Sequence, residues 1–259
     1  MDSPLIGIVV PTLGVRNDYL VQSLKSIRQA GNSFISIVAP KPDEIRSLIS
    51  PFLFDSVLQD PMMGLAKALN VGILDLPESI KYVNWLGDDD LLAKDSLNMT
   101  SVFLENNPDV DFVYGKCQYI DNEGKIIWTN KSGAYAQILM RFGPQLVPQP
   151  GALFRREAFH SIGGLNVSYQ AAFDLDLFIR FSKTKRMKYI PNLLASFRWH
   201  ENSISVGDRR KSVWEASQIR QQNFPRPIRF FSPIWEILVR SLIVIAGRLI
   251  SYLGNKSRR

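Results

Sequence analysis

The chain has 259 residues, of which 46% are apolar and 21% are charged. This composition excludes a disordered or low-complexity protein, and the length suits one large α/β domain or two small ones. The single cysteine, Cys117, excludes an internal disulfide and a cysteine-based zinc site, as is typical of a reducing compartment. The first residues carry no basic segment and only a short apolar run, so we expect no signal sequence.

Positive charge is concentrated at the C-terminus. The net charge is +7, but residues 209–259 hold 11 Lys and Arg against two acids, Glu215 and Glu236, for a net +9. Residues 1–208 carry a net −2. A nucleic-acid-binding domain would carry positive charge on its folded body, so this distribution argues against a nucleic-acid partner. It predicts a domain over 1–208 followed by a basic extension over 209–259, which we expect to be helical and to associate with a membrane.

The residues up to about position 115 alternate short apolar runs with helical patterns, as a parallel α/β sheet requires. We expect strands over 5–10, 34–39, 82–86 and 112–119, and helices after residue 17, over 64–74 and over 93–105. Residues 122–124 (Asn-Glu-Gly) indicate a hairpin. The second half is less regular, with short strands expected over 151–154 and 194–200 and a helix over 174–182. The pattern favours one mixed α/β unit with a C-terminal appendage.

Three adjacent carboxylates, Asp88, Asp89 and Asp90, follow directly after the strand expected over 82–86. Ligands of open α/β sheets bind at the carboxyl ends of the strands. Adjacent carboxylates repel one another unless they share a cation, and hard divalent ions prefer oxygen ligands. This position favours a metal-binding role over the alternative, an acidic turn in which one Asp caps the next helix.

Two more acidic residues lie in the helix expected over 174–182. Successive helical residues are rotated by about 100°, so Asp174 and Asp176 point about 200° apart and cannot serve one site equally. Asp176 and Arg180 have the i,i+4 spacing of a helical ion pair. Asp174, at the helix start, is either an N-cap, which the residue alone favours, or a carboxylate that points into a cleft.

Arg198 and His200 are two positions apart in the strand expected over 194–200, so their side chains would share a face. A guanidinium and an imidazole together suit a phosphate or a metal-bound diphosphate. The alternative, which the pair in isolation favours, is a surface pair at a strand end. The chain contains no GxGxxG after its first strand, no GxxxxGK[ST], no HExxH and no GxSxG, which argues against dehydrogenases, P-loop NTPases, zinc proteases and serine hydrolases.

Seven segments, in this order, resemble a family 2 glycosyltransferase. They are residues 9–14, 64–72, 85–92, 113–115 with 120–124, 163–165, 174–180 and 197–205. Each motif is common alone, but seven in register across residues 5–205 are specific. The resemblance implies an α/β fold of the GT-A type, which is Rossmann-like and typical of nucleotide-diphospho-sugar transferases. It implies a mixed central sheet, followed here by the amphipathic C-terminal appendage.

The resemblance also implies roles for individual residues in an inverting sugar transfer. Asp174 matches the catalytic base, and Asp88–Asp90 match the DxD-type motif that holds Mg²⁺ or Mn²⁺. Asp90 is the expected direct metal ligand, with Asp88 and His200 as further ligands. The expected donor-binding residues are Pro11, Thr12, Leu13, Asp43, Lys67, Asn70, Asp88, Asp89 and Arg198.

The sequence departs from the family pattern at two places. Phe173 precedes the expected base, where the family commonly has an acidic residue. Residues 38–43 replace the usual acidic nucleotide-binding cluster after the second strand, and Asp43 is the residue left there to recognise the nucleobase.

The C-terminal segment has its own pattern. Apolar residues recur at helical spacing from Ile234 to Leu253, while Glu236, Arg240 and Gly247 fall on the opposite side. Arg248 interrupts the longest apolar stretch, which we therefore judge too short and too charged to span a bilayer. A basic amphipathic helix over 226–259 suits an anionic membrane surface, and the alternative is a helix that packs on its own domain or on a partner.

The expected activity is transfer of a sugar from a nucleotide-sugar donor to a hydroxyl of a glycan or lipid-linked acceptor. The resemblance places it in cell-surface polysaccharide biosynthesis, in the cytoplasm and peripherally at the inner face of the cell membrane. One alternative is a sugar nucleotidyltransferase, although residues 13–16 form a poor version of its Gly-rich basic signature. Another is a catalytically silent protein that binds nucleotide-sugars or serves as a membrane scaffold.

Overall fold

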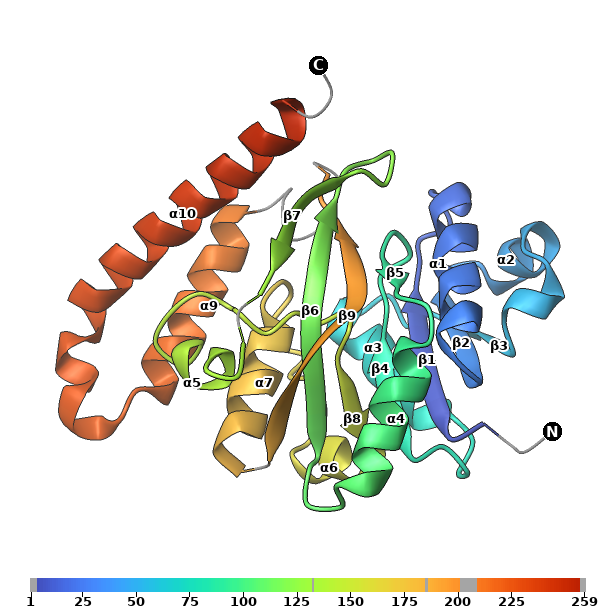
Figure 1. The fold of residues 1–259 in the computed structure, drawn as a ribbon, viewed down its shortest axis with the longest axis horizontal. Helices are drawn as coiled ribbons and strands as arrows, with labels where there is room; N and C mark the ends of the chain where they lie inside the picture. Colours follow the sequence, from blue (N-terminus) through green and yellow to red (C-terminus); the bar gives the residue numbers. More distant parts are fainter. Residues whose placement is uncertain (1–3, 132, 185, 201–208, 257–259) are drawn as a thin grey trace.

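The computed structural model describes residues 4–131, 133–184, 186–200 and 209–256 (Figure 1). A mixed sheet crosses the molecule, and its described strands follow the order β3-β2-β1-β4-β8-β6-β9-β5, with β7 paired to β6. The strands are β1 (Ile6–Pro11), β2 (Ser33–Ala39), β3 (Ser56–Gln59), β4 (Tyr82–Trp85), β5 (Leu91–Leu92), β6 (Phe112–Ile120), β7 (Ile126–Asn130), β8 (Leu153–Arg155) and β9 (Met187–Arg198). The expected α/β class with a mixed sheet is confirmed.

The N-terminal part of the sheet is parallel. β1 lies between β2 and β4, and Ile6 is in register with Ser33 on one side and Tyr82 on the other. β8 then runs antiparallel to β4 and β6, while β6 and β9 are parallel neighbours. β1 and β4 therefore end at the same edge of the sheet, and residues 12–16 and 87–90 follow them there.

Helices cover both faces of the sheet. The helices are α1 (Asn17–Ala30), α2 (Pro42–Leu48), α3 (Leu65–Asp75), α4 (Ser96–Asn106), α5 (Ala136–Leu139), α6 (Arg156–Ser161) and α7 (Phe173–Thr184). Side chains alternate across a strand, so Ile8 of β1 packs in a core with α1 and α4, whereas Val9 packs in a second core with α3, α6 and α7. Gly72 allows α3 to approach closely, because a Cβ there would lie 2.5 Å from Val9 Cγ1.

Two long helices complete the chain. α9 (Arg209–Asn223) packs against α7, and a 3₁₀ turn (Arg226–Phe231) leads into α10 (Ser232–Lys256), which runs back along α9 (Figure 1). Ile219 of α9 is fully buried in the core that contains α7. The division into domains at 208/209 stays a prediction, because residues 201–208 lie outside the described part of the chain.

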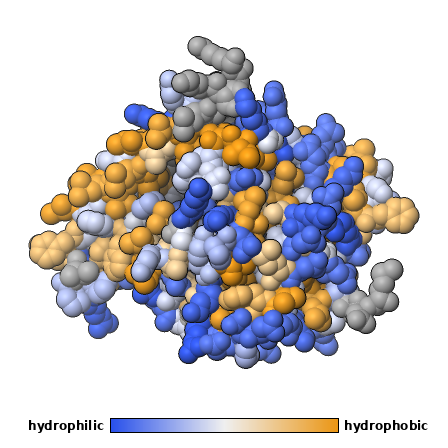
Figure 2. All heavy atoms as spheres, in the orientation of Figure 1, coloured by the Kyte–Doolittle hydropathy of each residue, from blue (hydrophilic) through white to orange (hydrophobic). Residues whose placement is uncertain are grey.

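One face of α10 is turned away from the protein. Its exposed apolar side chains follow a helical stripe, and orange spheres gather along this helix at the left of Figure 2. Within the described residues, one helical segment, Arg229–Ile250, is long and apolar enough to cross a membrane. Only 22% of its most apolar stretch is buried inside the protein. The sequence-based judgement that this stretch is too short and too charged to span a bilayer is therefore wrong as regards length and composition. Arg258 and Arg259 lie outside the described residues.

Candidate active site

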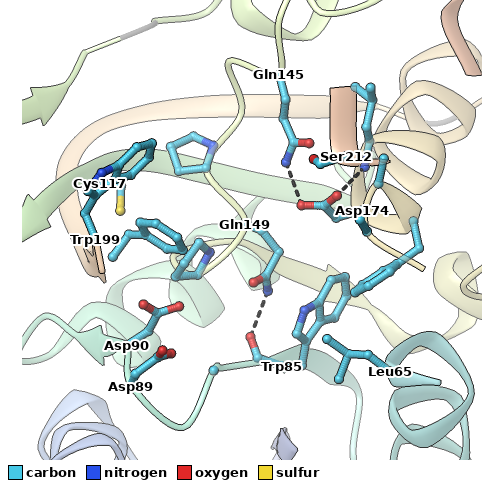
Figure 3. A pocket seen from close by; sticks show the side chains of 18 of the residues that line it. Leu65, Trp85, Asp89, Asp90, Cys117, Gln145, Gln149, Asp174, Trp199 and Ser212 are labelled. Carbon is cyan, nitrogen blue, oxygen red and sulfur yellow. Dashed lines mark hydrogen bonds between the residues drawn. The ribbon is translucent and has the colours of Figure 1, made fainter. Parts of the chain in front are cut away.

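A cavity of about 700 Å³ lies at the edge where β1 and β4 end. Its wall includes Pro11, Thr12 and Leu13 after β1, the acidic residues 88–90 after β4, and Asp174 at the start of α7. Figure 3 shows Asp89 and Asp90 on one side of this pocket and Asp174 on another. The structure thus brings together two acidic motifs that lie 84 or more residues apart in the sequence.

The acidic triad is already engaged by side chains of the protein. Asp88 accepts hydrogen bonds from Thr12 Oγ1 at 2.6 Å and from Arg16 Nη2 at 2.6 Å. Arg16 Nη1 donates to Asp89 Oδ2 at 2.7 Å, and the same carboxylate oxygen lies 2.7 Å from His200 Nε2. Arg16 therefore clamps Asp88 and Asp89 together from the loop that follows β1.

Asp90 lies deeper than its neighbours. Its Oδ1 accepts the backbone N–H of Arg198 at 2.9 Å, and the residue is 4% exposed. Burial, followed by the nearby Asp89 carboxylate, raises the pKa of Asp90 well above its ordinary value. Burial also raises the pKa of Asp88, against the opposing effects of Thr12 and Arg16. A divalent cation at this wall would oppose both effects, since positive charge favours the ionised carboxylates.

Two carboxylate oxygens lie beside Gly87. A Cβ built on this glycine would lie 2.9 Å from Asp89 Oδ1 and 3.1 Å from Asp90 Oδ2. Mg²⁺ is commonly held by one or two carboxylates together with water and substrate phosphates, so this pair of oxygens fits the expected metal. The structure does not gather Asp88, Asp90 and His200 as ligands, and within the ranges described no group of three His, Cys, Asp or Glu residues has metal-binding geometry. The metal-binding role expected for Asp88, Asp90 and His200 therefore stays a prediction.

Arg198 is part of the support behind the triad and does not line the pocket. It is 1% exposed, donates from Nε to the backbone carbonyl of Asp89 at 2.9 Å, and lies 4.3 Å from the centre of the Tyr19 ring. His200 also lies against Asp89, as described above, but it follows β9, which ends at Arg198, so the two residues do not share a strand as expected. Their phosphate- or metal-binding role stays a prediction. The rest of the motif predicted over 197–205, from residue 201 on, lies outside the described residues.

Besides Arg198, three more of the expected donor-binding residues lie away from the pocket wall. Asp43 is exposed on α2 and pairs with Arg46. Asn70 joins α3 to the loop after α6, because its side chain donates to and accepts from the backbone of Leu165. Lys67 lies on α3 and is not among the lining residues. A nucleotide-binding role for these three stays a prediction, without support from the geometry.

Asp174 is held at the pocket by two hydrogen-bond donors. Gln145 Nε2 donates to its Oδ2 and the backbone N–H of Leu175 donates to its Oδ1, each at 2.8 Å (Figure 3). Burial raises the pKa of Asp174 despite these bonds. Asp176 turns the other way and forms the expected ion pair with Arg180 at 2.8 Å. A base near neutral pH benefits from a raised pKa, so this environment suits proton abstraction.

The segment that leads into α7 is held from a distant part of the chain. The Glu215 carboxylate, on α9, accepts the backbone N–H groups of Gln170, Ala171 and Ala172 at 2.8–3.1 Å. These N–H groups precede Phe173, the first residue of α7, whereas Asp174 itself accepts the backbone N–H of Leu175 in the first turn. Glu215 is 4% exposed, so α9 fastens the segment that presents the expected base.

Sequence reasoning missed several residues of this site. Arg16 appeared only in the poor nucleotidyltransferase signature, although its place in the first loop after β1 is a usable signal. Gln145 and Gln149 lie in a Pro-rich irregular stretch, and Gln149 Nε2 donates to the backbone carbonyl of Trp85 at 2.8 Å (Figure 3). Glu215 is one of only two acids in a strongly basic segment, and that contrast indicates an internal partner.

Sequence comparison finds glycosyltransferases. No family model matches the chain. A PGL/p-HBAD biosynthesis glycosyltransferase of Mycobacterium bovis, also found in Mycobacterium tuberculosis, is 28% identical over 207 residues, which cover 76% of this chain and 78% of that protein. An uncharacterized glycosyltransferase of Methanocaldococcus jannaschii is 24% identical over 144 residues, 52% of this chain and 49% of that protein.

Solved structures of glycosyltransferases share the fold. S. aureus TarS (residues 1–349) in complex with UDP-GlcNAc has a TM-score of 0.63 at 12% identity, over 98% of this chain and 91% of that chain. The mannosyltransferase PcManGT of Pyrobaculum calidifontis, in complex with GDP-Man and Mn²⁺, has a TM-score of 0.61 at 15% identity, over 98% of this chain and 74% of that one. A longer TarS chain is covered to 39% of its length.

These similarities confirm the expected resemblance at the level of glycosyltransferases, and membership of family 2 stays a prediction. The chain has the GT-A-like fold of these enzymes and is similar to glycosyltransferases in sequence over most of its length.

Proposed function

We propose that this protein transfers a sugar from a nucleotide-diphospho-sugar to an acceptor hydroxyl, with inversion at the anomeric carbon. The observation that carries the proposal is a single pocket that both Asp88–Asp90 and Asp174 line. The relatives named as glycosyltransferases, and the neighbours in complex with UDP-GlcNAc or GDP-Man, support the donor class. The nucleobase, the sugar and the linkage depend on loop contacts with the ligands.

The donor diphosphate would lie against the triad. Asp89 Oδ1 and Asp90 Oδ2 would hold Mg²⁺ or Mn²⁺, which supplies positive charge to the leaving diphosphate. Thr12 and Arg16 keep Asp88 and Asp89 in place, and the Arg198 backbone keeps Asp90 in place. The neighbour in complex with GDP-Man and Mn²⁺ supports use of a divalent cation.

Asp174 would accept the proton of the acceptor hydroxyl as this oxygen attacks the anomeric carbon. Gln145 and the backbone N–H of Leu175 orient the carboxylate. With a base on the side opposite the leaving group, direct displacement needs no covalent intermediate and no second carboxylate nucleophile. The reaction therefore inverts the anomeric configuration.

We place the reaction in cell-surface polysaccharide biosynthesis, on a glycan or lipid-linked acceptor. The protein would work in the cytoplasm, with α10 at the inner face of the membrane. The exposed apolar stripe of α10 supports this setting.

The first test is thermal stability against UDP-, GDP-, dTDP- and CMP-sugars, with and without Mn²⁺. Ligand at about 100 times its dissociation constant stabilises the folded state by about 2.7 kcal/mol. We expect a metal-dependent shift with one nucleotide that Asp90→Asn abolishes and that Asp95→Asn, an exposed control, retains. A thermal shift with a nucleoside triphosphate, together with pyrophosphate release, would instead indicate a sugar nucleotidyltransferase. No thermal shift with any of these ligands would indicate the catalytically silent scaffold.

The second test concerns the base. Asp174→Asn should abolish sugar transfer while it leaves the donor-induced thermal shift nearly intact, because the carboxylate is needed only for proton abstraction. Asp176→Asn is the matched control, since this residue lies on the same helix and pairs with Arg180 away from the pocket. Transfer that persists in Asp174→Asn at the wild-type rate would overturn the assignment.

A further inference from the structure

The pocket extends beyond Asp174 to the two C-terminal helices. α9 contributes Ser212, Val213, Ala216 and Arg220 to its wall, and α10 contributes Ile243, Ala246, Gly247 and Ile250. Apart from Ser212 and Arg220 these residues offer no polar side chain. Arg220 presents no free charge, because Glu236 binds its guanidinium in a bidentate pair at 2.7 and 2.8 Å. One pocket therefore has a polar, acidic end and an apolar end.

α10 separates this apolar end from a second apolar surface. Its pocket-lining residues lie on one side, and at about 100° per residue Ile243 and Ile245 point about 200° apart. The outer side carries exposed Ile234, Leu238, Leu242, Ile245 and Leu249, each at least 57% exposed. The helix thus has an apolar face toward the pocket and another toward the surroundings.

The outward charge of these helices is basic. Both acids of residues 209–256 are internal: Glu215 caps the segment before α7, and Glu236, 1% exposed, binds Arg220. Arg226, Arg229 and Arg248 remain exposed around the apolar stripe. An exposed apolar stripe with cations and no outward carboxylate fits the surface of an anionic lipid bilayer, where apolar side chains enter the interface and cations meet lipid phosphates.

From this arrangement we infer that the acceptor is an amphiphile. Its sugar head would lie at Asp174, and its alkyl or isoprenoid chain would pass between α9 and α10 toward the bilayer. The inference rests on the proposed function for the head and on the pocket wall for the chain. A free glycan would leave the apolar end of the pocket without a matching ligand group, whereas a hydrocarbon chain buries apolar surface there.

The test uses an alkyl glucoside with a photoreactive diazirine in its alkyl chain, presented in vesicles of phosphatidylcholine and phosphatidylglycerol. Mass spectrometry locates the cross-links. We expect labels on Val213, Ala216 and Ile243 that unlabelled octyl glucoside competes away and glucose does not. Labels confined to the outer stripe, or competition by glucose alone, would overturn the inference.

Matched substitutions of two isoleucines give the control. Ile243→Ser on the pocket side should reduce pocket labelling by about tenfold, since it removes one apolar contact with the chain. Ile245→Ser on the outer side should leave pocket labelling unchanged. The tryptophan variants repeat the comparison, since Ile243→Trp fills the pocket end and Ile245→Trp, on the outer side, does not. Vesicle flotation together with the donor-induced thermal shift shows which variants are folded. Equal pocket labelling in both serine variants would contradict the inference.

Donor hydrolysis without acceptor separates the two proposals. A protein that hydrolyses or binds a nucleotide-sugar but shows no pocket labelling disproves the amphiphilic acceptor and leaves the glycosyltransferase standing. Pocket labelling without any donor response disproves the proposed transfer and leaves the chain-binding site standing.

Discussion

Asp174 lines the pocket, yet its carboxyl group lies in a buried environment. Two donors hold its carboxylate, yet burial raises its pKa above the ordinary value of 3.8. Between that value and the raised one, the folded protein keeps a proton that the unfolded chain has lost. The free energy of unfolding therefore falls as pH rises through this window, and the ionised residue remains a cost at neutral pH.

This cost predicts that Asp174→Asn stabilises the protein while it inactivates it. The amide resembles the protonated carboxyl, so the variant should be more stable than the wild type at pH 8, and the difference should shrink as pH approaches 4. Urea unfolding across this pH range measures the effect. A variant that is less stable than the wild type at every pH would contradict the burial argument.

Gly87 has no side chain, and this leaves room beside it for two carboxylate oxygens. Gly87→Ala would press a methyl group against Asp89 Oδ1 and Asp90 Oδ2, so we expect loss of the Mn²⁺-dependent part of the donor-induced thermal shift. The unliganded thermal midpoint reports whether the fold is retained. Ala93→Gly, close in sequence to residues 87–90, serves as the control. Gly124→Ala would not, because the positive φ of 88° at Gly124 strains any side chain. An unchanged metal dependence would exclude this pair as the binding oxygens.

A buried ion pair connects the two C-terminal helices. Arg220 and Glu236 are 0% and 2% exposed at their side chains and join α9 to α10. A buried pair contributes little net stability, but removal of one partner leaves an uncompensated charge. The pair therefore holds α10 in one position against α9, where residues of α10 line the apolar end of the pocket.

Glu236→Gln should destabilise the protein by about 3–5 kcal/mol, because the Arg220 guanidinium then loses its counter-charge in the interior. The double variant Arg220→Met with Glu236→Gln should recover much of this loss, since no buried charge remains. Urea unfolding of the wild type, the single and the double variant measures both effects. A single variant within about 0.5 kcal/mol of the wild type would show that the pair is accessible to water.

Elements differ in how well the sequence predicts them. β1, β2, β4 and β6 carry continuous apolar runs and were predicted within a few residues. β9 begins at Met187, earlier than expected, because Pro191 and Asn192 look like a turn inside a long strand. The sequence predicts a helical extension over 209–259 but not α9 as a separate helix, because its polar composition hides a buried side that includes Arg220 and Glu215.

The site follows the same logic. Residues 88–90 and Asp174 could be placed because each follows a recognisable strand or begins a recognisable helix. Arg16, Gln145 and Glu215 could not, because their roles depend on which distant carboxylate or backbone each one meets. The local sequence pattern indicates where a polar residue lies within its helix, strand or loop. Which group it binds is determined by tertiary packing.

At the scale of the whole molecule, the acidic pocket and the basic, apolar flank lie in one body. The near-neutral part of the chain carries the expected chemistry, and α10 carries the surface that faces outward (Figure 1, Figure 2). The packing of α10 along α9 favours a helix that lies on a membrane over one that crosses it, because its inner side is occupied by protein.

Substitutions on the outer stripe should therefore reduce membrane binding without loss of the fold. Leu242→Ser with Leu249→Ser removes two exposed side chains, each of which contributes about 1.5–3 kcal/mol when buried in lipid, and flotation with anionic vesicles should fall more than tenfold. Leu48→Ser with Leu74→Ser, at exposed positions on other helices, is the matched control. Equal flotation of the two double variants would assign membrane contact to another surface.

The contact of Glu215 with the segment before α7 limits where this chain can be joined to a relative in a chimera. The segment that leads into the helix of Asp174 is held by Glu215, 41 residues beyond Asp174, so a chimera joined between the two would separate the proposed base from its anchor. Acceptor preference in such hybrids would then change together with the rate, whichever sugar the donor carries. The smallest unit that can be exchanged between two such enzymes runs from the loop before α7 through α9.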